Sequence, residues 1–105
     1  MLAERLDLEV TLRAARDAGR KLLVPYVTGG MDDAWLTTLQ AMADGGADAV
    51  EVGIPFSDPV MDGPTIQEAS EAALRGGANL PAILTALREV DAGVPLVAMT
   101  YVNLV

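Results

Sequence analysis

One acidic residue in this sequence lies inside an apolar strand pattern. Glu51 is flanked by Val50 and Val52, and because side chains alternate across a strand, it points away from both valines. In a parallel sheet covered on both faces, that position places a carboxylate in the interior. Desolvation favours the neutral form of a carboxyl group, which suits general acid–base catalysis. The alternative is a structural Glu that bonds a backbone amide, pairs with an Arg or lies at an exposed sheet edge.

Two aspartates, Asp58 and Asp62, follow Glu51 in a loop rich in proline and glycine. Glu51 is near the C-terminal end of its predicted strand, and parallel α/β folds bind ligands at the carboxyl ends of strands. A rigid loop over that end can hold a second carboxylate near the first. Asp also favours turns and helix caps, and these are the alternative roles of both residues.

The other candidates have equally good structural explanations. Tyr26, Phe56 and Tyr101 lie at or just beyond predicted strand ends, where they can line an apolar pocket or belong to the core. The glycine pair Gly29-Gly30 lacks the spacing and the lysine of phosphate-binding loops, and a tight turn explains it as well.

Alternating helix and strand patterns surround these residues. Apolar residues at helical spacing predict four helices, and continuous apolar runs predict three strands. Strands separated by helices imply parallel pairing with right-handed crossovers. The predicted helices are residues 2–18, 33–44, 65–75 and 79–92, and the predicted strands are 21–28, 47–53 and 94–102.

Local signals mark several element boundaries. Asp32 or Asp33 is expected to cap the second helix, and Thr65 begins a capping-box pattern for the third. Pro25 conflicts with its strand, because proline has no N–H for a sheet ladder. The first helix has an apolar stripe at Leu2, Leu6, Val10 and Ala14, with Leu12 and Ala15 beside it.

Composition excludes several classes of function. The 105 residues carry a net charge of −8, whereas binding a nucleic-acid backbone needs a basic face. The chain has no His and no Cys, which removes disulfides, thiolate chemistry and the commonest metal ligands. No signal peptide or membrane-spanning apolar run is visible, and we expect a cytoplasmic protein.

The predicted elements make one domain, residues 1–105, without a linker. Three parallel strands with helices on one side leave two open edges and an unpacked sheet face. A closed (β/α)8 barrel needs eight strands and about 250 residues. We therefore expect the first part of a larger α/β fold rather than a complete open sheet.

A long motif carries a family resemblance. The segment 50–59, Val-Glu-Val-Gly-Ile-Pro-Phe-Ser-Asp-Pro, and the segment 62–67, Asp-Gly-Pro-Thr-Ile-Gln, resemble the signature of the tryptophan synthase alpha chain family. Residues 24–28 resemble the first strand of that family, including the proline that conflicts with a strand. Residues 46–48 resemble its approach to the second strand, and Met99-Thr100-Tyr101 with Asn103 resembles its third.

The resemblance implies a TIM barrel with an extra N-terminal helix and the retro-aldol cleavage of indole-3-glycerol phosphate to indole and glyceraldehyde 3-phosphate. It implies that Glu51 protonates the indole ring carbon and that Asp62 holds the indole N–H. Tyr26, Thr28 and Tyr101 match positions in the substrate pocket. The resemblance implies no metal or organic cofactor for this reaction.

The resemblance also implies a partner, the tryptophan synthase β chain, in an α2β2 heterotetramer. The family's phosphate-binding loops belong to a C-terminal half that these 105 residues lack, so we expect the chain alone to be inactive. One alternative is a non-catalytic partial barrel that self-associates or docks on a β chain. Another is a relative that releases free indole without a β partner.

Overall fold

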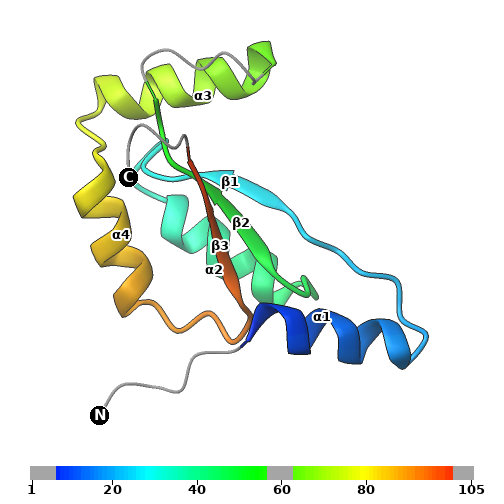
Figure 1. The fold of residues 1–105 in the computed structure, drawn as a ribbon. Helices are drawn as coiled ribbons and strands as arrows, with labels where there is room; N and C mark the ends of the chain where they lie inside the picture. Colours follow the sequence, from blue (N-terminus) through cyan, green and yellow to red (C-terminus); the bar gives the residue numbers. More distant parts are fainter. Residues whose placement is uncertain (1–6, 57–62, 101–105) are drawn as a thin grey trace.

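The computed structural model describes residues 7–56 and 63–100, in which helices and strands alternate (Figure 1). The longest described helix has 12 residues, and none of the described helices has the length and apolar character needed to cross a membrane. In chain order the elements are α1 (Leu8–Asp17), β1 (Tyr26–Thr28), α2 (Trp35–Asp44), β2 (Val50–Gly53), α3 (Pro64–Arg75), α4 (Leu80–Glu89) and β3 (Leu96–Met99).

The strands form a parallel sheet in the order β1-β2-β3, which confirms the predicted parallel pairing. The central strand β2 contains Glu51, which pairs in register with Tyr26 of β1 and Val97 of β3. In Figure 1, α1 lies by the ends where the strands begin, and α3 lies beyond the ends where they finish. The sheet therefore has a carboxyl end that faces α3.

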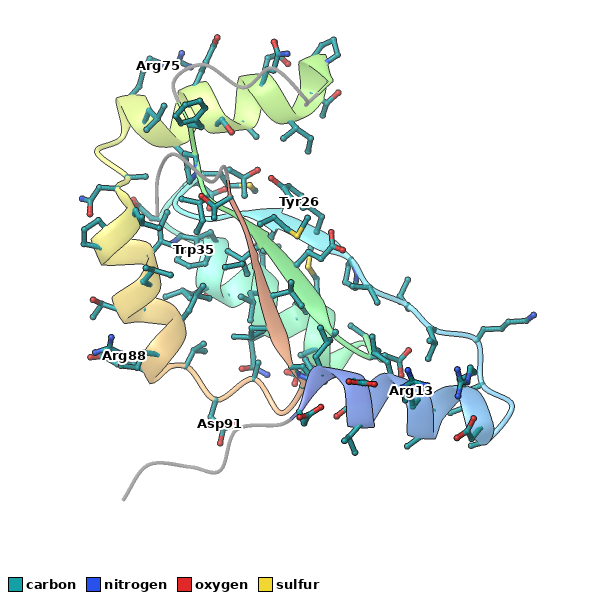
Figure 2. The ribbon with its side chains drawn as sticks, viewed as in Figure 1. Arg13, Tyr26, Trp35, Arg75, Arg88 and Asp91 are labelled. Atoms are coloured by element: carbon teal, nitrogen blue, oxygen red, sulfur yellow. The ribbon has the colours of Figure 1, made fainter. Side chains whose placement is uncertain are left out.

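The hydrophobic core lies on one face of the sheet. Val50 and Val52 are fully buried there, and each buried side chain of this size contributes about 1.5–3 kcal/mol relative to an exposed one. Figure 2 shows Trp35 between the sheet and α4, on the side where α2 also packs. The buried members of this core are Val27, Trp35, Leu39, Ala47, Val50, Val52, Ile54, Ile83, Leu87 and Ala92.

Two prolines show why the outer strands are shorter than predicted. Pro25 and Pro95 stand just before β1 and β3, and their carbonyl oxygens accept hydrogen bonds of 2.9 and 3.0 Å from the amides of Glu51 and Val50. Pro25 needs no N–H in this position, so its conflict with the strand disappears. The predicted strand over residues 21–28 is wrong for its first half, since β1 begins only at Tyr26.

The predicted caps of two helices are wrong. Thr65 does not cap α3, because the helix already begins at Pro64, with Gly63 as its N-cap. Proline is favoured at this first helical position, where its missing N–H costs nothing. The carboxylate of Asp32 accepts from the amide of Ala34 at 2.9 Å, so it orders the turn before α2 without capping the helix itself.

The apolar stripe predicted for the first helix is also displaced. Val10 is 65% exposed, whereas Ala15 is buried and Leu12 is half-buried. Helix α1 packs only at one end of the sheet, so a narrow side of it meets the rest of the molecule (Figure 1). Periodicity identified the helix but not the side that is buried.

Candidate active site

Glu51 lies on the sheet face opposite the hydrophobic core. Its neighbours Val50 and Val52 are fully buried against the helices, while Glu51 itself is half-buried. Helices α2 and α4 both pack on the valine side, whereas α3 lies beyond the carboxyl end of the sheet and contacts β1. The interior position was expected for a sheet covered on both faces, and for the complete fold it stays a prediction. The expected unpacked face is present at Met99, which is 47% exposed, but not at Thr28, which is 2% exposed.

Two other predicted site residues share this face with Glu51. Tyr26 pairs directly with Glu51, and Thr28 pairs with Gly53 two residues further along. Neighbouring strands are about 4.8 Å apart, so the side chains of Tyr26 and Glu51 leave the sheet side by side. Thr28 is only 2% exposed. The structure thus brings together a carboxylate, a phenol and a hydroxyl from two strands.

The end of β2 is held from both sides. The amide of Gly29 donates to the carbonyl of Gly53 at 2.8 Å, and the amide of Ile54 donates to the carbonyl of Met99 at 2.9 Å. Parallel α/β folds place ligands at this end of their strands. Glu51, two residues before Gly53, is positioned by a backbone that both neighbouring strands restrain.

Sequence reasoning missed the role of Asp48, a buried residue just before β2. Its carboxylate accepts from the guanidinium of Arg20 at 2.6 Å and from the amide of Leu23 at 2.8 Å. Its own amide donates to the carbonyl of Leu23 at 2.8 Å. These contacts tie the segment after α1 to β2, three residues before Glu51. The signal in the sequence was an Asp between two alanines at the start of an apolar strand.

The remaining predicted site residues lie outside the described part of the chain. These are Asp58, Asp62 and Tyr101. Phe56 is described and half-buried, just beyond the carboxyl end of β2. The roles assigned to Asp62 and Tyr101 therefore stay predictions.

A hollow among the described residues lies away from Glu51. It measures about 350 Å³ and is bordered by Met31, Trp35 and Ile83, where the turn after β1 meets the turn between α3 and α4. None of Glu51, Tyr26 and Thr28 lines it. Within residues 7–56 and 63–100, no three His, Cys, Asp or Glu side chains gather as a metal site would need. The candidate site is an open sheet face in this part of the chain.

Known proteins similar to this chain agree with one another. The family model for the tryptophan synthase alpha chain matches residues 12–105. The alpha chain of Azoarcus sp. is 46% identical over 101 residues, which cover 91% of this chain and 37% of that relative. The alpha chain of Streptomyces avermitilis is 45% identical, with coverage of 91% and 36%.

Solved structures give the same result for the fold. The tryptophan synthase of Mycobacterium tuberculosis matches with a TM-score of 0.84 and 41% identity, over 95% of this chain and 40% of that chain. The alpha subunit of Legionella pneumophila matches with a TM-score of 0.77 and 35% identity, over 91% of this chain and 38% of that chain. This chain spans little more than a third of the length of the curated relatives, at 36% and 37% of the two named above.

Proposed function

The chain belongs to the tryptophan synthase alpha chain family, and from this premise we propose that it serves tryptophan biosynthesis as the acid–base part of an enzyme. Its three parallel strands are part of a (β/α)8 barrel, the fold of its structural neighbours. The reaction is the cleavage of indole-3-glycerol phosphate to indole and glyceraldehyde 3-phosphate. Residues 1–105 act in it as one partial barrel domain.

The observation that carries this proposal is the position of Glu51. It is the acidic residue of the central strand, it lies near the carboxyl end, and it points to the face opposite the hydrophobic core. A carboxylic acid in that position can give a proton to the indole ring carbon that bears the side chain. Protonation leaves positive charge on the ring nitrogen. A second, ionised carboxylate, Asp62, balances that charge at the indole N–H.

The proposed cleavage also balances in protons. As the carbon–carbon bond breaks, the adjacent side-chain hydroxyl loses its proton and becomes the aldehyde. The bonding electrons return to the ring, which gives neutral indole. One proton is gained at carbon and one is lost from oxygen, so Glu51 can end the cycle in the form in which it began. Tyr26, Thr28 and Tyr101 border the substrate beside it.

We expect the 105-residue chain alone to be inactive. Glu51 is only half-buried, so its carboxylate stays hydrated, and water weakens the electrostatic preorganisation on which catalysis depends. The open face also exposes Met99, at 47%, on the edge strand β3. The remaining elements of the barrel would cover this face and supply the phosphate site. The β chain is the proposed partner, in an α2β2 assembly.

A second candidate function follows from the same open face. The edge strand β3, on which Met99 is 47% exposed, favours association with another chain. A non-catalytic partial barrel that self-associates or docks on a β chain would use it in this way. Light scattering of the 105-residue chain, with and without a β chain, measures this directly.

A joined protein tests the catalytic proposal. It consists of residues 1–105 followed by the part of the Azoarcus sp. alpha chain beyond its matched region. We expect it to release indole from indole-3-glycerol phosphate, and Glu51→Gln to lower kcat by about 10²–10⁴-fold, the usual contribution of general acid–base catalysis. Asp62→Asn should also lower kcat. The exposed Glu68 of α3 provides the control, since Glu68→Gln should leave kcat unchanged.

Two results would count against the proposal. One is a folded joined protein without turnover. The other is turnover that survives Glu51→Gln, because the proton would then come from elsewhere. Indole release by the 105-residue chain alone, abolished by Glu51→Gln, would contradict the need for the rest of the barrel.

A further inference from the structure

Gly53, the last residue of β2, has a close neighbour that explains why it is glycine. A Cβ atom at this position would overlap the hydroxyl oxygen and Cζ of Tyr26, and it would come within 2.9 Å of Cε2. These are the three nearest atoms, and all belong to one side chain. The phenol of Tyr26 therefore lies directly over the bare Cα of Gly53.

Backbone conformation does not explain this glycine. Gly53 is absent from the described glycines with positive φ, so an L-residue could adopt its backbone angles. Gly30 provides the contrast: its φ is +73°, and an added Cβ would also meet Ala78 at 2.6 Å. Gly30 allows the backbone conformation of its turn, whereas Gly53 leaves the space that the Tyr26 ring occupies.

The contact fixes the direction of the Tyr26 ring. Its Cα lies opposite Glu51, while its hydroxyl lies over Gly53, two residues further along on the same face. The ring thus runs toward the carboxyl end of the sheet, beside Glu51. No described residue donates a hydrogen bond to this hydroxyl or accepts one from it. A phenol hydroxyl can do both, so it is available to a ligand.

We propose that Gly53 is a positioning residue, which holds the Tyr26 phenol across the sheet as one wall of the substrate pocket and directs its hydroxyl to the substrate. This inference rests on the proposed function. Tyr26 is the group that touches the substrate, and Gly53 acts only through it. A Cβ at position 53 would push the ring to another rotamer while leaving the strand pairing of β2 in place.

A double-mutant cycle in the joined protein tests the proposal. Gly53→Ala should lower kcat/KM by about ten- to hundredfold, the range expected when a group in the site is misplaced. In the background of Tyr26→Ala the same change should cost less than about twofold, because no ring remains to be displaced. Tyr26→Phe keeps the ring and should cost about two- to tenfold, the value of one hydrogen bond.

Gly76→Ala is the matched control for the glycine substitution. The C-cap Gly76 has a φ of −81°, and the nearest atoms to an added Cβ lie at 3.5 and 3.6 Å, so a methyl group fits without displacing anything. It should leave kcat/KM unchanged. An equal loss from Gly53→Ala with and without the Tyr26 ring would overturn the proposal, because the glycine would then act independently of Tyr26.

A second measurement does not depend on turnover. In the 105-residue chain, NMR should show ring-current shifts of the Gly53 α-protons and contacts between them and the Tyr26 ring, and both should vanish in Tyr26→Ala. Absence of these contacts in the unmodified chain would refute the positioning role. If the contacts are present but every joined variant lacks turnover, the proposed function is wrong, and with it the substrate-facing role of Tyr26.

Discussion

The two faces of the central strand differ, although the residues that make them alternate along one short segment. Val50 and Val52 are fully buried under α2 and α4, whereas Glu51 is half-buried on the opposite face. The valine face holds the described part of the molecule together. The glutamate face presents polar groups at the carboxyl end of the sheet.

The difference shows how stability and chemistry are separated within one strand. A side chain on the valine face that loses volume leaves a cavity, since the core around it is closely packed. Glu51, on the other face, is half-buried and has room to change without disturbing this packing. Substitutions on the two faces should therefore affect different measurements.

The largest loss of stability is expected in the core under the valine face. Leu39 of α2 is fully buried, so Leu39→Ala should lower the free energy of unfolding by about 2–5 kcal/mol. Urea unfolding followed by circular dichroism measures this change. Leu84 of α4 is 42% exposed, and Leu84→Ala should cost only about 0.5 kcal/mol. Equal losses of unfolding free energy in Leu39→Ala and Leu84→Ala would contradict the described position of the core.

A smaller loss is expected where the segment after α1 is tied to β2. Asp48→Ala leaves the amide of Leu23 and the guanidinium of Arg20 without their acceptor, which should cost about 1–3 kcal/mol of unfolding free energy. Asp48→Asn keeps one acceptor oxygen and should cost less. Asp17 forms an exposed ion pair with Arg16, so Asp17→Ala should change stability by less than about 1 kcal/mol.

The caps of the helices provide a third comparison. The side chain of Asn79 accepts from the amide of Ala82 at 2.9 Å and caps α4, one of the two helices on the valine face. Asn79→Ala should lower the free energy of unfolding by about 1 kcal/mol. Thr65 does not cap α3, so Thr65→Ala should change it by less than about 0.5 kcal/mol. A larger effect at Thr65 would restore the capping box.

The smallest effect on stability is expected at Glu51. Among the described residues it forms no ion pair, so Glu51→Gln should change the free energy of unfolding by less than about 0.5 kcal/mol. Val50→Thr, one position away on the other face, buries a hydroxyl and should cost about 1–3 kcal/mol. If Glu51→Gln unfolds the chain, the two faces are not separated as described.

The sequence predicted which helices and strands are present better than it predicted where each begins and ends. The seven predicted helices and strands are all present in order, and the start of α4 near Asn79 is confirmed. Residues 22–24 are apolar and belong to the predicted strand, yet they lie outside β1, because strand formation needs a neighbour in register and not only apolar side chains. The side of α1 that is buried also depends on what packs against it.

The candidate site was predicted in part for the same reason. Alternation along β2 placed Glu51 away from its valines, and Tyr26 and Thr28 were expected near it. Their shared face is visible only once β1 and β2 are paired. The partners of Asp48 lie 25 and 28 residues away along the chain, and no local pattern could identify them.

The sequence by itself determined the alternation of helices and strands, the glycines that end them and the motif that identifies the family. These depend on the order and type of neighbouring residues. Only the tertiary structure decided which face of β2 stays open, where the strands end and why Gly53 has no side chain. These depend on register and packing between segments that are far apart in the chain, and a linear pattern does not specify such distances.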